Sequence, residues 1–435
     1  MRSYPSRRYA WFVVALLTIA YAISLLDRWI VTLLIEPIKG HFLLSDTQIG
    51  LLLGPIFAVF FIVAGLPLGW LADRYSRKFL IGVAMLFWCA MTAMSGVARS
   101  FSQLAFARFG VGAGEAALTP AANSLIADLF PRDQQSRAIS VFSMGVSIGF
   151  GLAYLLGGQI IAWMAAHPAV NWPLAGTLAS WQSVLVAVAL PGVLIAGVIL
   201  CLQEPQRRES QAANRQASWV AMRDYLRRHR WAYILLCVGM GASPLVGYAW
   251  QWLPTTFARV WQWPVPQFAR IYGTILLIFG PLGALSAAVL STRMYRAGRQ
   301  NAPYIATMIS VTGLVVAAGL VPLMPTPQWA VLLMIPATWF GAMSTSAGAA
   351  ALVFMTPGDY RARASAAYIV AINAIGLPSG PLLVGLLNDH VFTAHDGVRY
   401  SLAAVPLLVG GVLALTLYFG PGRYAAAVRE LEAAR

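Results

Sequence analysis

The sequence predicts an all-α polytopic membrane protein with twelve transmembrane helices in two six-helix halves. Of its 435 residues, 59% are hydrophobic and only 10% are charged, whereas a soluble domain carries about 25% charged residues. The apolar stretches are continuous, have roughly the 20-residue length of a spanning helix, and do not alternate as barrel strands do. One long polar segment divides them six and six. We therefore expect six-helix halves at 1–202 and 231–435, joined by a cytoplasmic linker at 203–230.

The orientation follows from the basic residues. The twelve stretches begin near Trp11, Gln48, Phe79, Gln103, Ala138, Trp181, Trp231, Phe268, Ala302, Trp329, Ala364 and Ser401. Placing both termini in the cytoplasm puts most of the 30 Lys and Arg residues on the inner side, as the positive-inside rule requires. The net charge of +15 therefore indicates topology anchors and not nucleic-acid binding.

We expect a monomeric, multi-pass protein of the cell inner membrane. The three cysteines lack metal-ligand spacing, so they predict no metal site. No cofactor is expected.

The first predicted helix, Trp11 to about Ile35, contains Asp27 and Arg28 in its outer half. Neighbouring residues on a helix point about 100° apart, so the two side chains cannot neutralise each other on one face. Each then needs a partner on another helix. The alternative is that the pair lies near the outer headgroups, with the Arg28 side chain extending to water.

The fourth predicted helix, 103–127, contains Arg108 and Glu115. Their spacing of seven residues places both on one helix face, roughly 10 Å apart. A charge near the bilayer centre costs at least ~2.5–3.5 kcal/mol, so it normally faces a cavity or a partner. Asp27 lies at a depth between the two, which predicts one cluster of four charges. The alternative is a purely structural ion pair between helices. Pro120 should bend the lower part of this helix.

A further group of residues is predicted to control conformational change. Asp73 lies at the cytoplasmic end of the second helix, where a carboxylate can stabilise a neighbouring helix N-terminus or pair with an Arg in one conformation. Pro244, flanked by glycines, should break the seventh helix near its centre. The full set of predicted gating residues is Asp73, Arg74, Arg77, Arg137 and Pro244.

The second half repeats the first in sequence but not in charge. Pro131, Asp133 and Arg137 recur as Pro357, Asp359 and Arg363. A parallel repeat of this kind is typical of alternating-access transporters. The second half lacks mid-membrane charges, and aromatic and amide side chains are its candidates for substrate contact. These candidates are Tyr248, Trp250, Trp339 and Asn373.

Several motifs together resemble the Major Facilitator Superfamily, most closely its bacterial spinster-like branch. They are Leu26-Asp27-Arg28, Gly69 to Lys78, Arg108 with Gly112 to Ala116, and Asp128-Leu129-Phe130. The resemblance covers the whole chain and implies proton-coupled transport of lysolipid-like or sphingoid-like amphiphiles. It departs from the usual pattern at Ser76, where a glycine is common, and at Gly149-Phe150, where proton antiporters have Gly-Pro. The choice between symport and antiport therefore stays open.

The predicted function is proton-coupled secondary active transport, and not enzymatic catalysis. Asp27 and Glu115 would carry protons, while Arg28 and Arg108 would attract an anionic head group. The expected partners are a small-molecule substrate, protons and membrane lipids. Because the anion:cation symporter branch shares these four residues, a compact organic anion such as a sugar acid is the alternative substrate. A non-transporting lipid sensor is the alternative of another class.

Overall fold

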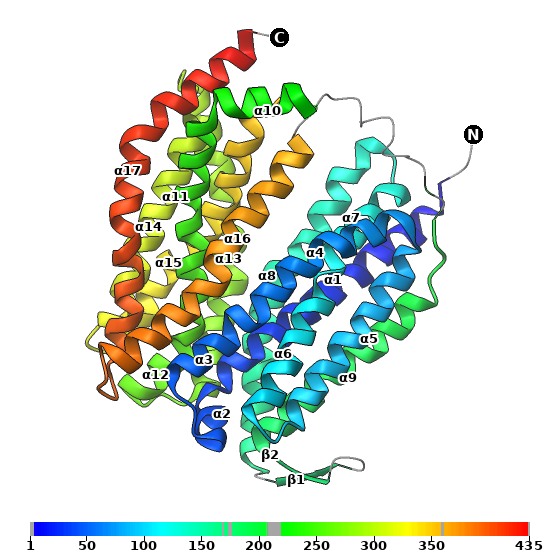
Figure 1. Ribbon diagram of the computed structural model, residues 1–435, viewed down its shortest axis with the longest axis vertical. Helices are drawn as coiled ribbons and strands as arrows, with labels where there is room; N and C mark the ends of the chain where they lie inside the picture. Colours follow the sequence, from blue (N-terminus) through cyan, green and yellow to red (C-terminus); the bar gives the residue numbers. More distant parts are fainter. Residues whose placement is uncertain are drawn as a thin grey trace. The chain divides into compact units, whose positions relative to one another are not determined.

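The computed structural model describes residues 4–167, 169–172, 176–205, 207, 219–357 and 361–433. This part of the chain is helical apart from loops and one antiparallel hairpin, β1–β2, in which Ala169 pairs with Ala179 (Figure 1). Within it, eleven helical segments are long and apolar enough to cross a membrane. The predicted all-α polytopic fold is confirmed. The fourth predicted span is absent from the eleven because it consists of two shorter helices.

Chain order in the first half is as follows. The elements are α1 (Arg7–Trp29), a 3-10 turn (Ile30–Leu33), α2 (Ile35–Phe42), α3 (Asp46–Leu53), α4 (Pro55–Arg74), α5 (Arg77–Gly96), α6 (Phe101–Glu115), α7 (Leu118–Leu129), α8 (Arg132–Ala165), β1 (Ala169–Trp172), β2 (Gly176–Ala179) and α9 (Ser180–Leu200).

The remainder of the chain begins with a short helix in the predicted linker. The elements are α10 (Trp219–Arg228), α11 (Arg230–Ala249), a 3-10 turn (Trp250–Trp252), α12 (Leu253–Trp261), α13 (Val265–Arg296), α14 (Ala302–Leu320), a 3-10 turn (Val321–Leu323), α15 (Pro327–Phe354), α16 (Arg361–His390) and α17 (Val398–Ala433). Helix α10 runs crosswise to α11 and α17 (Figure 1), as expected for an amphipathic surface helix.

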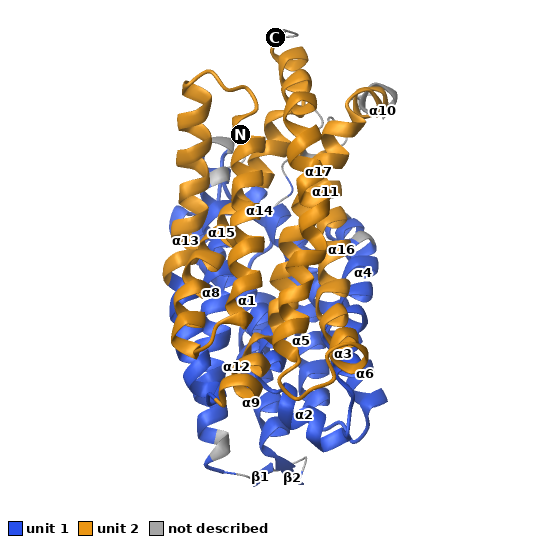
Figure 2. Cartoon of the chain, turned by 90° about the vertical axis from the view of Figure 1, so that its left-hand side faces the viewer, with its two compact units in different colours: residues 1–209, 263–277 blue, residues 210–262, 278–435 orange. Residues whose placement is uncertain are grey.

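The chain forms two compact units (Figure 2). Unit 1 contains Met1–Glu209 and Trp263–Leu277, and unit 2 contains Ser210–Gln262 and Ile278–Arg435. In unit 1, α1 packs on α8, and α5 packs on α6 and α9. In unit 2, α11 packs on α16, and α14 packs on α15 and α17. The same helix pairs recur in the same order, as the internal sequence repeat predicts.

Segment 263–277, which the sequence assigns to the second half, groups with unit 1. Aromatic contacts explain this grouping. The Tyr154 ring of α8 lies 6.1 Å from that of Phe268 and 4.8 Å from that of Tyr272, measured between ring centroids. Gly158 lies against Ala269, where an added Cβ would come within 2.8 Å of the alanine methyl. The absence of a side chain therefore lets α13 approach α8 closely.

Two predicted spans of unit 1 are interrupted for local reasons. The second is divided at Gly54, whose φ of −103° and ψ of −97° are not helical, and Pro55 begins α4. The fourth is divided at Ala116 and Ala117, between α6 and α7. Pro120 has no N–H to donate to the carbonyl four residues earlier, so it removes the hydrogen bond that would continue the helix there. The sequence predicts a bend near Pro120, and regular helix is interrupted one turn before it.

The predicted break at Pro244 is wrong. Helix α11 continues through Pro244, and regular α-helix ends only at the 3-10 turn Trp250–Trp252. Close packing of α16 explains the difference. A Cβ added at Gly376 would lie 2.6 Å from the backbone of Pro244, and one added at Gly380 would lie 2.6 Å from the carbonyl oxygen of Leu245. A neighbouring helix at this distance holds the proline-containing segment in helical form, as is common in membrane proteins.

Candidate functional site

The predicted cluster of four charges exists within unit 1. Asp27 and Arg28 lie in the last turn of α1, and Arg108 and Glu115 lie on α6. All four are buried, with exposed fractions of 0%, 8%, 2% and 3% respectively. The alternative in which Arg28 extends to the headgroup region is therefore excluded. Their roles in proton coupling and substrate binding remain predictions.

Glycines let α6 pack closely against α4 and α5. A Cβ added at Gly112 would collide with the carbonyl oxygen of Phe57 on α4, and one added at Gly114 would lie 2.9 Å from the Cβ of Trp88 on α5. No larger residue fits at either position without moving a helix. The glycine-rich sequence before Glu115 therefore seats α6 against α4 and α5, with its charged face toward α1.

Arg28 and Glu115 form a closed ion pair. Nη2 of Arg28 donates to Oε2 of Glu115 at 2.6 Å, and Nε donates to the same oxygen at 3.1 Å. The other oxygen, Oε1, has no hydrogen-bond partner among the described residues. The Arg28 guanidinium also lies over two stacked rings, 4.5 Å from Phe57 and 4.7 Å from Phe61. These cation–π contacts hold the positive group where water does not reach it.

Arg108 is much less well paired. Among the described residues, its Nη1 donates only to the backbone carbonyl of Asp27, at a long 3.4 Å. Its Nε has no partner within the described part of the chain. The guanidinium carbon lies 5.5 Å from the centre of the Phe57 ring, so this ring serves both arginines. A guanidinium offers five N–H donors in a planar fork that matches carboxylates and phosphates. Arg108 is thus the cation of the cluster best able to bind an anion.

Asp27 differs from Glu115 in having no direct partner for its carboxylate. Neither oxygen accepts a hydrogen bond of full geometry from a described residue, although the side chain is completely buried. The indole N–H of Trp88 points to it as its one side-chain donor among the described residues, but in a geometry too poor for a full hydrogen bond. Burying an ionised carboxylate without hydrogen bonds is costly. The two acids of the cluster therefore occupy chemically different surroundings, which is the arrangement expected when one of them exchanges protons.

The predicted substrate contacts of the second half lie in unit 2. Trp250 is buried in the 3-10 turn after α11, and Tyr248 precedes it on α11. Trp339 of α15 is half-buried, with its ring 6.4 Å from that of Phe279. The Asn373 amide donates to the backbone of its own helix, α16, at 2.9 Å. Contact of these residues with a substrate remains a prediction.

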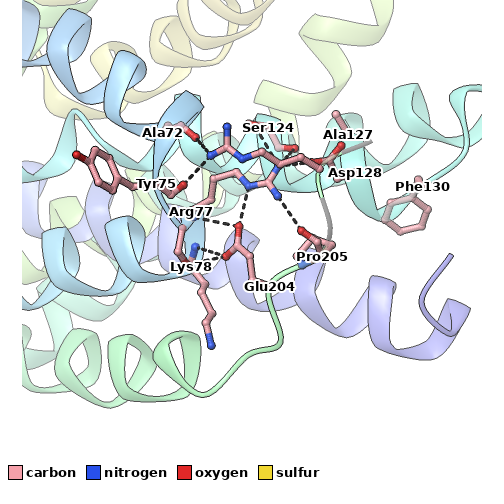
Figure 3. Close-up of polar contacts among 12 residues, drawn as sticks. Ala72, Tyr75, Arg77, Lys78, Ser124, Ala127, Asp128, Phe130, Glu204 and Pro205 are labelled. Carbon is pink, nitrogen blue, oxygen red and sulfur yellow. Dashed lines mark hydrogen bonds and ion pairs between the residues drawn. The ribbon is translucent and has the colours of Figure 1, made fainter. Parts of the chain in front are cut away.

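A second charged cluster surrounds Arg77 at the start of α5 (Figure 3). The Arg77 side chain is 1% exposed and forms an ion pair with Asp128 of α7. Its Nε donates to Oε1 of Glu204 at 2.8 Å, beyond the end of α9. Further donations go to the carbonyl oxygens of Ser124 at 3.1 Å and Pro205 at 3.0 Å. One guanidinium therefore joins α5, α7 and the segment after α9.

Glu204 also caps the N-terminus of α5. Its carboxylate accepts the backbone N–H groups of Arg77 at 3.1 Å and Lys78 at 3.0 Å, and the Ser76 hydroxyl at 2.9 Å. Burial alone would raise the pKa of Glu204, but these hydrogen bonds and the Arg77 side chain outweigh it and lower the pKa below its usual value. Ser76, at the position where a glycine is usual, thus contributes as the N-cap of α5.

Arg207 makes the complementary contact with the end of α4. Its Nη2 donates to the carbonyl oxygens of Ala72 at 2.8 Å and Tyr75 at 2.7 Å. A cation is favourable at a helix C-terminus, just as a carboxylate is at an N-terminus. The segment after α9 therefore binds both sides of the connection between α4 and α5.

The other predicted gating residues have different surroundings. Arg74 lies over the ring of Trp70 at 4.0 Å, and Arg137 lies 5.6 Å from the ring of Trp11. The side chain of Asp73 lies outside the described residues. The sequence interpretation did not identify Glu204 as a partner of Arg77. A signal was present, since Glu204 is an acid placed just after the last apolar residues of α9 in an arginine-rich segment.

Comparison with known proteins decides the family. A sequence model of the Major Facilitator Superfamily matches residues 17–335. The chain belongs to this superfamily. Among similar proteins, an MFS-type efflux pump of Mycolicibacterium smegmatis is 26% identical over 96% of this chain and 94% of its own length. The protein spinster of Drosophila melanogaster is 24% identical over 94% of this chain and 69% of its own length.

Solved structures of other transport proteins share the fold. A bacterial homolog of the human lysosomal transporter Spinster, in an inward-facing and unoccupied conformation, has a TM-score of 0.81 and 24% identity, with 98% of both chains covered. A D-xylose–proton symporter has a TM-score of 0.71 and 16% identity, over 93% of this chain and 97% of its own. This chain is therefore a multi-pass membrane transporter and not an enzyme, as predicted, and its spinster-like resemblance is confirmed.

Proposed function

We propose that this transporter couples proton movement to the alternating-access transport of a small amphipathic or anionic organic molecule. We further propose that it acts as a monomer in the cell inner membrane. One observation carries the coupling proposal. A closed ion pair, Arg28–Glu115, lies beside a buried carboxylate without a full hydrogen bond, Asp27, and an incompletely bonded guanidinium, Arg108.

Charge balance gives the physical reason for coupling. When both acids are ionised, the two guanidinium groups and two carboxylates of the cluster cancel. An anionic head group bound at Arg108 adds one negative charge, and a proton on either carboxylate restores neutrality. Two unit charges 4 Å apart interact by about 4 kcal/mol at an effective dielectric constant of 20. This corresponds to about three orders of magnitude in binding, so anion and proton each favour the binding of the other.

The two acids take different parts in this scheme. Asp27, buried and without a full hydrogen bond, carries the proton in the conformation described here. Glu115 becomes a proton carrier when Arg28 leaves it to contact the substrate head group. Opening the site to water from one side, and then from the other, changes the solvation of both carboxylates and so changes which one is protonated.

An amphipathic substrate agrees with the unequal chemistry of the two halves. The first half supplies both guanidinium groups, while Tyr248, Trp250, Trp339 and Asn373 are the proposed contacts contributed by the second. Aromatic side chains bury apolar surface at about 25 cal/mol per Å², so an alkyl chain would gain affinity from them. We also propose that Asp73, Arg74, Arg77, Arg137 and Pro244 influence the balance between inward-facing and outward-facing states, and not substrate binding.

The test uses purified protein in liposomes with an imposed pH gradient. The ligands are lysophospholipids that share one head group with acyl chains of decreasing length, and glucuronate as a compact anion. Glu115→Gln and Asp27→Asn should lose proton-driven accumulation and retain exchange of bound substrate. Glu430→Gln, at an exposed ion pair with Arg228, is the matched control and should behave as wild type.

Three results would contradict the proposal or a part of it. A Glu115→Gln protein that still accumulates substrate against its gradient would exclude Glu115 as an essential proton carrier. Affinity that is indifferent to acyl-chain length, and unchanged in Trp250→Ala and Trp339→Ala, would exclude the amphiphile and favour the compact anion. Ligand binding with no transport by the wild-type protein would favour a lipid sensor.

A further inference from the structure

Trp88 of α5 is a buried hydrogen-bond donor that the proposed mechanism does not use. The residue is 0% exposed, and its indole N–H is the one side-chain donor that the described residues direct at the Asp27 carboxylate. The bond is incomplete in this conformation, because neither the indole nitrogen nor either Asp27 oxygen has a partner of full geometry within the described part of the chain. A buried donor and a buried carboxylate, each lacking a complete hydrogen bond, therefore face each other.

Helix packing places this part of α5 beside Asp27. A Cβ added at Gly192 of α9 would collide with the Cys89 sulfur of α5 and would come within 3.5 Å of the Ile23 side chain of α1. Ile23 lies four residues before Asp27, on the same face of α1. The residue next to Trp88 therefore lies close to the helix face that carries Asp27, as the direction of the indole N–H also indicates.

Helix α6 fixes the other side of Trp88. A Cβ added at Gly114 would lie 2.9 Å from the Cβ of Trp88, and Gly114 directly precedes Glu115. The base of the Trp88 side chain is therefore held against α6, while its indole N–H reaches toward Asp27 on α1. One side chain of α5 thus contacts both helices of the charge cluster.

An indole N–H responds to the charge on its acceptor, because it donates a hydrogen bond and cannot accept one. Hydrogen bonds to an ionised carboxylate are shorter and about twice as strong as those to a neutral acceptor. Donation from Trp88 therefore favours the ionised form of Asp27 over the protonated form. The other titratable or charged groups around Asp27 come from α1, α5 and α6. They are Arg28, Cys89, Arg108 and Glu115.

Other indole N–H groups of this chain have acceptors that do not titrate. Trp252 donates to the carbonyl oxygen of Pro381 at 3.0 Å, and Trp172 donates to the Ser183 hydroxyl at 3.1 Å. Those bonds are complete because their acceptors keep the same charge at every pH. The acceptor of Trp88 can gain and lose a proton, and an incomplete bond is expected while the carboxyl group is protonated and is a weaker acceptor.

We propose that Trp88 is a positioning residue for proton transfer at Asp27. Its indole N–H completes a hydrogen bond to the carboxylate when the proton leaves, and the bond loosens again when a proton returns. The conformation described here corresponds to the protonated carboxyl. Trp88 thereby eases release of the proton and holds the ionised carboxylate in place until the next one arrives. This role rests on the proposed proton coupling, whereas the hydrogen bond itself does not.

The hydrogen bond is tested by infrared difference spectra of the purified protein in detergent, recorded over a series of pH values. They follow the carbonyl stretch of the protonated Asp27 carboxyl, which Asp27→Asn identifies by its loss. Trp88→Phe removes the N–H and keeps an aromatic ring. The control, Trp252→Phe, makes the same exchange at another residue that is 0% exposed.

We expect the midpoint of the Asp27 titration to rise by at least about half a pH unit in Trp88→Phe, because the ionised form loses its donor. Trp252→Phe should keep the wild-type midpoint. An unchanged midpoint in Trp88→Phe would overturn the proposal. So would a wild-type Asp27 that does not titrate over the accessible pH range, since no ionised carboxylate would then exist for Trp88 to position.

Transport in liposomes separates positioning from packing. The pH midpoint of proton-driven uptake of the lysophospholipid probe should rise in Trp88→Phe and not in Trp252→Phe. In an Asp27→Asn protein, Trp88→Phe should have no further effect on exchange of the bound probe, because the group that it positions is gone. A several-fold loss of exchange there would show a structural role and overturn the proposal. A wild-type protein that moves no protons, with the infrared shift present, would overturn the proposed coupling and support the hydrogen bond.

Discussion

Replacing Glu204 by glutamine removes a negative charge from the centre of the Arg77 cluster. Glu204 accepts four hydrogen bonds, from the backbone N–H and Nε of Arg77, the N–H of Lys78 and the hydroxyl of Ser76. A glutamine keeps one acceptor oxygen, but its NH₂ group then faces donors. Of its two carboxylate partners, Arg77, whose side chain is 1% exposed, would retain only Asp128.

The expected loss of stability follows from these contacts. Removing one partner of a fully buried ion pair costs about 3–5 kcal/mol. The cost here should be smaller, because Asp128 remains and the Glu204 side chain is 25% exposed. Each hydrogen bond to a charged group contributes about 1.5–3 kcal/mol. We therefore expect Glu204→Gln to lower the free energy of unfolding by about 2–3 kcal/mol, the equivalent of one such bond together with the lost charge at the α5 N-terminus.

The assay is denaturant unfolding of the purified protein in detergent, with Glu430→Gln as the control. Glu430 pairs with Arg228 at 2.8 Å, but both side chains are exposed, so its loss should cost no more than about 1 kcal/mol. The lowered pKa of Glu204 means that its stabilisation is present above the unfolded-state pKa of about 4.3 and is lost as the pH falls through the folded-state pKa. The difference in the free energy of unfolding between wild type and Glu204→Gln should therefore be constant from about pH 6 to 8. It should decrease toward zero below about pH 4. Equal losses in the two variants at neutral pH would refute this reasoning.

Two further predictions concern the helix contacts of the charge cluster. Gly112→Ala should destabilise the protein by about 1–3 kcal/mol, because the new methyl collides with the Phe57 backbone; Gly65→Ala, with no atom within 4 Å, should be neutral in the same denaturant titration. Phe57→Leu should raise the lysophospholipid concentration for half-maximal uptake about 5-fold or more by releasing Arg28 and Arg108, while Phe57→Tyr should restore it. An unchanged half-maximal concentration in Phe57→Leu would show that the ring has no part in holding the guanidinium groups.

The sequence by itself determined the fold class, the repeat and the members of the charge cluster. Hydropathy over windows of spanning length is a local property, so the helices are predictable from it. A charge inside a membrane helix is expensive enough to require an interior position, which is why Asp27, Arg28, Arg108 and Glu115 could be grouped before their geometry was known.

Tertiary structure alone decided which of these charges meet. Arg28 pairs with Glu115, 87 residues away, and leaves Asp27 without a hydrogen bond of full geometry. The sequence does not distinguish which of the two carboxylates pairs with an arginine. Glu204 reaches Arg77 across 127 residues by the same kind of contact. Pro244 stays within a continuous helix because α16 packs closely against it. Pairing and helix continuity depend on distances of a few tenths of an ångström between packed helices, and residue order along one helix does not contain those distances.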